Sequence, residues 1–148
     1  MDGLALGADG QVHVVYRDGT DDDLRYASRG RGGIWEHETV DATGNLAAIA
    51  IGPDGAVHIA YRDSSNADLE YATRPSPGAP FELTTVDEVG NVGDEADLVV
   101  EADGTVHIAH VDRSAEDLRL STLAPGSGWS NVTLDAMGSV GFAPRLAT

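Results

Sequence analysis

A stretch of seven residues occurs three times in this chain of 148 residues. Residues 12–18 read VHVVYRD, residues 57–63 read VHIAYRD and residues 106–112 read VHIAHVD. Each copy is typical of a short β-strand, has histidine in second place and ends on aspartate. A motif that returns at a spacing of roughly 45 residues indicates an array of one supersecondary unit. This repeat restricts the possible folds more than any other feature of the sequence.

The segments around each copy repeat as well. An Asp-Gly pair precedes each copy between apolar runs, at positions 9–10, 54–55 and 103–104, which predicts a hairpin because the favoured turns need positive φ angles. A third strand follows each copy, and an aromatic residue opens a fourth strand at Trp35, Phe81 and Trp129. Glycine at 44, 90 and 138 indicates a further positive-φ turn in the connection to the next unit. No segment shows helical periodicity.

Four short strands in a meander, repeated at this length, are the pattern of a β-propeller blade. A β-solenoid would need shorter repeats, and a β-sandwich would not need the repeat at all. We therefore expect an all-β chain of three four-stranded antiparallel blades, with blade 1 at residues 1–41, blade 2 at 42–87 and blade 3 at 88–135. Residues 136–148 would form a crossover and begin the inner strand of a next blade.

A three-blade arc would expose an apolar face at each end, whereas closed propellers have about four to eight blades. Two copies would supply six blades, related by a two-fold axis along the ring. Leu4 and Leu146 both align with Leu98, so the two ends of the chain claim the same inner-strand position. We therefore expect a homodimer that closes a six-bladed ring. A fragment of a longer array is the alternative.

The hairpin between the third and fourth strands carries a family resemblance. Residues 28–35 read SRGRGGIW, which resembles a degenerate Asp-box of the BNR-repeat, sialidase-like propellers, although Gly30 stands where the box has its aspartate. Residues 121–129 and 73–81 are looser matches. The resemblance implies propeller blades. Because the box is structural in that family, the resemblance locates no active site.

Two roles are open to the repeated histidines, His13, His58 and His107. As metal ligands they would have to converge, but equivalent positions on different blades point at neighbouring blades and lie too far apart to share one ion. As structural residues they would tie the strands of each blade through a polar network, together with a fourth-strand threonine and the aromatic residue, Trp35 or Trp129. We favour the structural role, which predicts a common hydrogen-bond partner for all three.

Acidic residues dominate the composition. The chain has 25 Asp and Glu against nine Lys and Arg, all nine of them arginine, and a net charge of −16. Such a surface repels the phosphates of nucleic acids and anionic lipids, so we expect neither nucleic acid nor membrane as a partner. Solubility, adaptation to high salt and a GC-rich genome each account for this composition. Cysteine is absent, no apolar run approaches the ~20 residues of a membrane helix, and the first residues do not resemble a signal peptide.

A four-stranded blade brings its 2–3 and 4–1 connections to the same edge. These connections are rich in carboxylates, and a ligand would sit there, near the axis or between blades. Such a face would suit a cation, a basic peptide or the hydroxyl groups of a glycan. The acidic run at 21–23 could hold calcium, although no complete calcium loop is present. The candidate residues of this face are Arg17, Asp18, Asp41, Asn45, Arg62, Asp63, Asp87 and Asn91.

Three functions compete. A non-catalytic, self-assembling blade-repeat scaffold explains every distinctive feature, and it is the one we favour. A propeller module that binds a carbohydrate or a cation is the alternative, although aromatic residues, on which sugars usually stack, make up only 5% of the chain. A sialidase-like glycoside hydrolase fragment could use Arg17, Arg62, Tyr16 and Tyr61, but repeat-equivalent residues suit a blade role better than one asymmetric site. No catalytic, cofactor or metal motif of high specificity is present.

Overall fold

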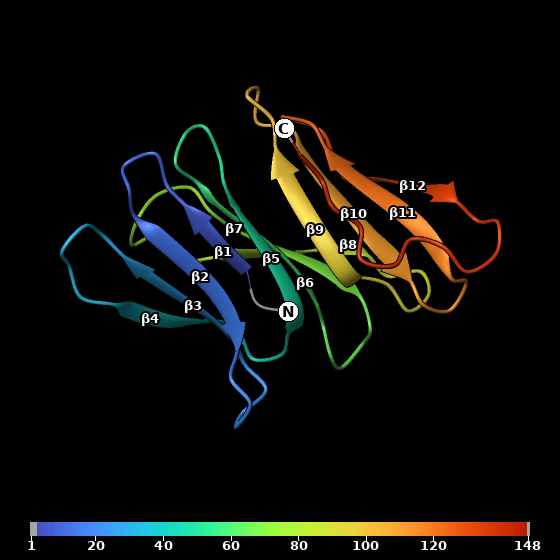
Figure 1. Ribbon diagram of the computed structural model, residues 1–148, viewed down its shortest axis with the longest axis horizontal. Helices are drawn as coiled ribbons and strands as arrows, with labels where there is room; N and C mark the ends of the chain where they lie inside the picture. The colour runs from blue at the N-terminus through green and yellow to red at the C-terminus, as the bar shows by residue number, and fades with distance from the viewer. Residues whose placement is uncertain (1–2, 148) are drawn as a thin grey trace.

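The computed structural model describes residues 3–147, which form three four-stranded antiparallel β-sheets, each with its strands in chain order (Figure 1). The predictions that include residues 1, 2 and 148 extend beyond this described part. No helix within residues 3–147 is long and apolar enough to span a membrane. The strands are β1 (Gly3–Leu6), β2 (Val12–Arg17), β3 (Leu24–Arg29) and β4 (Glu36–Asp41); β5 (Asn45–Ile51), β6 (Val57–Arg62), β7 (Leu69–Arg74) and β8 (Glu82–Asp87); and β9 (Asp94–Val100), β10 (Val106–Asp112), β11 (Asp117–Leu123) and β12 (Ser130–Asp135).

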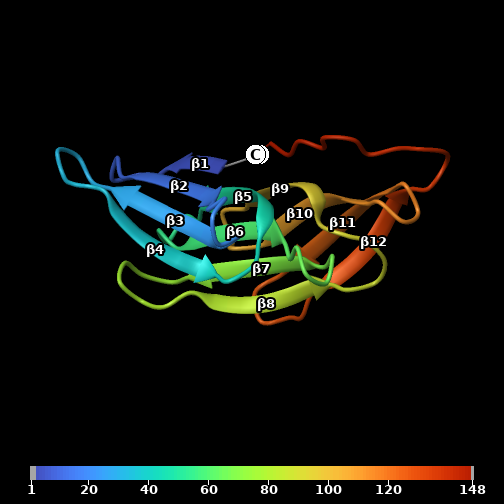
Figure 2. The same cartoon turned by 90° about the horizontal axis from the view of Figure 1, so that it is seen from below.

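The sheets are arranged as the blades of an arc. The first strands β1, β5 and β9 lie along one side, and the fourth strands β4, β8 and β12 lie along the opposite side (Figure 2). The strand β1 packs beside β5, and β5 packs beside β9. The expected all-β chain of four-stranded antiparallel blades is therefore confirmed.

Two apolar cores lie between the sheets, because successive side chains of each strand point to opposite faces. Val15 and Tyr26 of blade 1 pack against Ile59 and Tyr61 of blade 2 in the first core. The second core joins blades 2 and 3 and is built in the same way from the opposite face of blade 2. The second blade is therefore buried on both faces, and every residue of Val57–Arg62 except the last is buried.

The outer faces of blades 1 and 3 have no blade against them within the described chain. On blade 1, Leu4 is 70% exposed, whereas Leu98 in the equivalent position is buried between blades 2 and 3. On blade 3, Leu134 is 55% exposed, whereas its equivalents Val40 and Val86 are buried. Positions that build the core between blades therefore lie open at both ends of the arc.

The C-terminal segment repeats the crossover between blades. Val140 N donates to Glu116 O at 3.0 Å, as Val92 N donates to Ala67 O at 2.9 Å. The segment then runs back to β9 and ends beside the end of that strand (Figure 1), and Leu146 N donates to Asp97 Oδ2 of β9 at 2.9 Å. It does not form a strand. Residues 143–147 thus lie against β9 on the open end of blade 3.

Candidate ligand-binding pocket between two blades

A pocket of about 660 Å³ opens between blades 1 and 2, at the edge where the 1–2 and 3–4 hairpins emerge. Blade 1 contributes residues from its first hairpin and the start of β4, and blade 2 contributes the end of β7 and the turn after it. Apolar side chains such as Ile51 and Pro77 form part of the wall. The polar lining includes Asp9, His13, Ser28, Glu38 and Arg74.

Arg74 is the central charge of this pocket. Its side chain is only 8% exposed and forms an ion pair with Glu38 of the neighbouring blade. The guanidinium carbon lies 4.6 Å from the ring centroids of both Tyr26 and Phe81, a cation–π arrangement that fixes its position. The Nε atom is buried and has no hydrogen-bond partner among residues 3–147. The pocket therefore presents a fixed cation and a carboxylate side by side.

His13 closes one side of the pocket. Its Nδ1 lies 2.6 Å from the hydroxyl oxygen of Tyr26. Burial lowers the pKa of His13, and the nearby Asp9 only partly opposes this shift. The imidazole is therefore neutral at pH 7. Gly7 leaves the other ring nitrogen accessible, since a Cβ there would lie 3.3 Å from Nε2.

The position equivalent to this pocket, between blades 2 and 3, is apolar. Leu123 stands where blade 2 has Arg74, and Thr84 stands where blade 1 has Glu38. Trp129 packs edge-on against Tyr71, with ring centroids 5.1 Å apart, and joins the core there. Of the two blade junctions within the described chain, the junction of blades 1 and 2 is therefore the one that carries the arginine and the glutamate.

The repeated histidines do not all have the partner that we expected. His58 repeats His13, with Nδ1 at 2.5 Å from the Tyr71 hydroxyl. In blade 3, leucine replaces this tyrosine, and His107 instead contacts Thr122 at 3.0 Å and Glu101 at 2.6 Å. The partner is thus a third-strand tyrosine in two blades, and within residues 3–147 none of the three histidines bonds to the fourth-strand threonine. No group of three or more His, Asp and Glu side chains in the described chain is arranged to hold a metal ion.

The eight residues predicted to form a ligand face lie at the opposite edge of the blades. Most are engaged inside the chain: Arg17 with Asp22, Asp18 with Thr20 N, Asp41 with Tyr61, Arg62 with Asn91, Asp63 with Thr43 and Asn66, and Asp87 with Arg119. Asn45 pairs with Arg62 in the ladder and has a buried Oδ1 without a partner in residues 3–147. None of these eight described residues lines the pocket. A ligand at that face stays a prediction.

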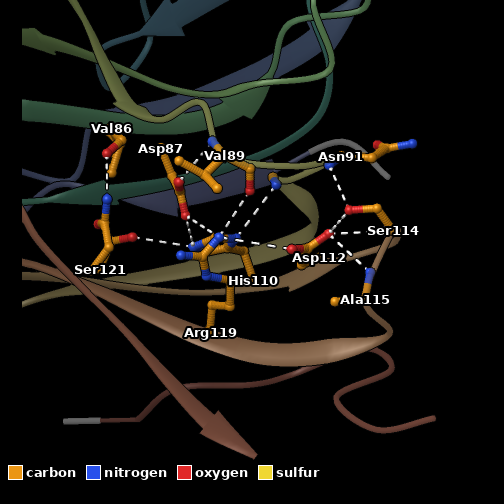
Figure 3. Close-up of polar contacts among 12 residues, drawn as sticks. Val86, Asp87, Val89, Asn91, His110, Asp112, Ser114, Ala115, Arg119 and Ser121 are labelled. Carbon is orange, nitrogen blue, oxygen red and sulfur yellow. Dashed lines mark hydrogen bonds and ion pairs between the residues drawn. The ribbon is translucent and has the colours of Figure 1, made fainter. Parts of the chain in front are cut away.

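A second polar cluster joins blades 2 and 3 (Figure 3). His110 takes the place of Tyr61, whose hydroxyl donates to Asp41 between blades 1 and 2. Arg119 Nη1 lies 3.0 Å from Asp87 Oδ2 and forms an ion pair with it, although the contact does not have hydrogen-bond geometry. The same Nη1 donates a hydrogen bond to the backbone oxygen of Val89. The cluster therefore ties the two blades through a buried carboxylate.

This cluster includes serine, histidine and aspartate, but not in the order of a nucleophilic triad. His110 Nε2 faces both Ser121 Oγ at 3.1 Å and Asp87 Oδ2 at 3.8 Å, and Nδ1 accepts from Gly93 N. A triad needs the serine and the carboxylate on different ring nitrogens. His110 and Ser121 are also fully buried, so we interpret the cluster as a structural tie.

No protein-family model and no curated protein matches the chain. Solved structures do. A triple mutant of AofleA from Arthrobotrys oligospora matches with a TM-score of 0.66 and 18% identity over 90% of this chain and 41% of that one, so the chain spans about two fifths of it. A fucose lectin from Kordia zhangzhouensis matches with a TM-score of 0.55 and 12% identity, over 89% of this chain and 97% of that one.

The NanB sialidase from Streptococcus pneumoniae matches with a TM-score of 0.58 and 18% identity, over 80% of this chain and 20% of that one. This similarity confirms the resemblance to sialidase-like propellers that residues 28–35 indicate. At such low identities the likenesses concern the fold alone. The chain is therefore an array of β-propeller blades.

Proposed function

We propose that the chain is a non-catalytic carbohydrate-binding module whose site is the pocket between blades 1 and 2. The observation that carries this proposal is the ion pair of the buried Arg74 with the partly exposed Glu38, beside an apolar wall. Sugar hydroxyls both donate and accept hydrogen bonds, so a fixed guanidinium and a carboxylate side by side satisfy neighbouring hydroxyls. The pocket volume of about 660 Å³ suits one or two sugar rings.

The solved structures support this choice of ligand class. One similar protein is a fucose lectin in complex with methyl-fucoside, and its chain is covered almost completely by this one. Methyl-fucoside is therefore the first probe, within a panel of neutral monosaccharides. Arg17, Arg62, Tyr16 and Tyr61, the residues that a sialidase-like reaction would need, lie outside the pocket lining.

Replacing Arg74 by alanine weakens sugar binding by about 100-fold, because the lost hydrogen bonds involve a charged donor. Isothermal titration calorimetry with the best sugar of the panel measures the change. Glu38→Gln lowers affinity as well, because it removes the charged acceptor but keeps the shape of the side chain. The control is Arg31→Ala, an exposed arginine outside the pocket, which binds as the wild type does. Equal affinities of Arg74→Ala and the wild type would exclude this site.

We also propose that two copies close a six-bladed ring, which makes the module a self-assembling scaffold. The two open ends have complementary groups. Arg25 occupies the position of Arg119, which pairs with Asp87 of the preceding blade, and the single chain has no blade in front of Arg25 to supply that carboxylate. Its Nε is buried without a partner within residues 3–147, as is that of Arg119. At the open end of blade 3, Asp135 is the repeat equivalent of Asp87, and it is exposed. A second copy would therefore bring Asp135 to Arg25.

Light scattering at micromolar concentration gives a mass near twice 15.4 kDa if the ring forms. Asp135→Arg shifts the protein toward the monomer, because it places two cations together at the junction. The double variant Asp135→Arg with Arg25→Asp restores the dimer, since it exchanges the two charges. A stable, folded wild-type monomer at this concentration would contradict the ring.

A further inference from the structure

We propose that closing the ring builds a second carbohydrate site, whose two halves come from different copies of the chain. This inference rests on the proposed function and on the proposed ring. The repeat supports this inference. Each blade contributes one set of side chains to the junction with the following blade and another set to the junction with the preceding blade. Each set comes from fixed positions in the repeat. The third junction of the array joins blade 3 of one copy to blade 1 of the other.

Blade 3 offers the first half at its open end. In the single chain a cavity of about 540 Å³ there is lined by Val99, Glu101, His107 and Leu120, together with Leu146 and Ala147 of the C-terminal segment, whose place the first strand of the second copy would take in the ring. His107 occupies the position that His13 has in the pocket of blades 1 and 2. Glu101 stands where blades 1 and 2 have Gly7 and Gly52, and it contacts His107 Nε2 at 2.6 Å. A carboxylate thus borders this half-site, although Val132 replaces Glu38.

Blade 1 offers the second half at the other open end. Arg29 repeats Arg74, and Trp35 repeats Phe81. The guanidinium carbon of Arg29 lies 5.0 Å from the Trp35 ring, close to the 4.6 Å between Arg74 and Phe81. Trp35 is 39% exposed and Arg29 is exposed as well. This half-site therefore has its cation and its aromatic ring in place, without a blade opposite them in the single chain.

The ring brings these halves together with the relation that blades 1 and 2 show. Arg29 of one copy then faces Glu101 and His107 of the second copy, as Arg74 faces Glu38 and His13. The junction of blades 2 and 3 differs, because Leu123 and Thr84 stand at the arginine and glutamate positions there. Each chain of the ring is therefore associated with about two sites, one internal and one shared.

Calorimetry with methyl-fucoside on the wild-type dimer gives the stoichiometry. About two sugars per chain are expected, and Arg74→Ala lowers this to about one. No binding of any sugar in the panel would overturn the proposed function itself. One sugar per chain, lost completely in Arg74→Ala, would leave the proposed function standing and overturn the shared site.

Subunit complementation tests whether two copies share the site. In an Arg74→Ala background, one chain carries Arg29→Ala and the other Glu101→Ala, and each alone forms dimers that bind no sugar. When the two chains are coexpressed, each mixed dimer has one junction with both groups intact, so binding returns. Arg31→Ala in place of Arg29→Ala keeps the site, as the matched control. If Arg29→Ala prevents dimerisation, Arg29→Lys replaces it and loses binding while keeping the charge. Mixed dimers that bind no sugar would overturn the shared site.

Discussion

Replacing Asp87 by alanine lowers the free energy of unfolding by about 3 kcal/mol, because breaking a buried ion pair leaves the partner charge uncompensated. Asp87 is 3% exposed and lies 3.0 Å from Arg119. Arg119 keeps its bond to Val89 O and its distance of 3.8 Å to Asp112, so the loss stays toward the lower end of the range for such pairs. The carboxylate also joins blade 2 to blade 3, and its loss weakens their contact.

Urea denaturation followed by circular dichroism measures this loss, which corresponds to a fall in Tm of about 10 °C. Asp87→Asn is expected to lie between the alanine variant and the wild type, because it keeps an acceptor without the charge. Asp21→Ala removes an exposed carboxylate and leaves the stability unchanged. If Asp87→Ala unfolds at the same urea concentration as Asp21→Ala, the ion pair does not hold the blades together.

Acidification from pH 6.5 to pH 4 lowers the stability of the fold by about 3 kcal/mol through His110 alone. Burial, assisted by the Arg119 charge, lowers the pKa of His110 from 6.5 to about 4. The unfolded chain therefore binds more protons than the folded chain in this range, so stability is complete above pH 6.5 and is lost as the pH falls toward 4. Burial also lowers the pKa of His13 and His58, and both add in the same direction.

The free energy of unfolding, measured at intervals across this pH range, shows the effect as a slope. His110→Tyr restores the residue of blades 1 and 2, and His110→Asn is a smaller substitute that does not titrate. Either variant loses most of the slope, and His13 and His58 contribute to what remains. His37→Asn, at an exposed histidine, is the matched control variant. A wild-type slope in both His110 variants would assign the acid sensitivity to other groups.

The fold could be predicted because its signals are local and occur three times. Gly10, Gly55 and Gly104 of the Asp-Gly pairs have φ angles of 80°, 84° and 88°, as hairpin turns require. The crossover was less predictable. Gly90 and Gly138 have positive φ, but Gly44 does not have the expected one. A Cβ on Gly44 would meet Leu24 at 2.9 Å, so close packing explains this glycine.

The pocket could not be predicted, because its residues depart from the repeat. Arg74 and Glu38 lie 36 residues apart on different blades, and only folding brings them together. At the equivalent positions blade 3 has Leu123 and Val132, which removes any repeated signal. The prediction of a ligand face relied on what all three units share, and the shared carboxylates cap turns and tie blades. A charged residue at a position where another blade has an apolar one would have been the better indicator.

In the proposed ring, the C-terminal segment would make closure an exchange rather than a simple addition. Leu146 already donates to Asp97 on the open end of blade 3, where the first strand of a second copy would have to lie. The dimerisation constant would then report the difference in binding free energy between the C-terminal segment and the first strand of a second copy at one position, so the segment would act as an internal competitor. Both occupants cannot be present at once, and a ligand that bridges the two copies would favour the intermolecular one. In this protein, sugar concentration and subunit association would be thermodynamically coupled through a few residues at the end of the chain.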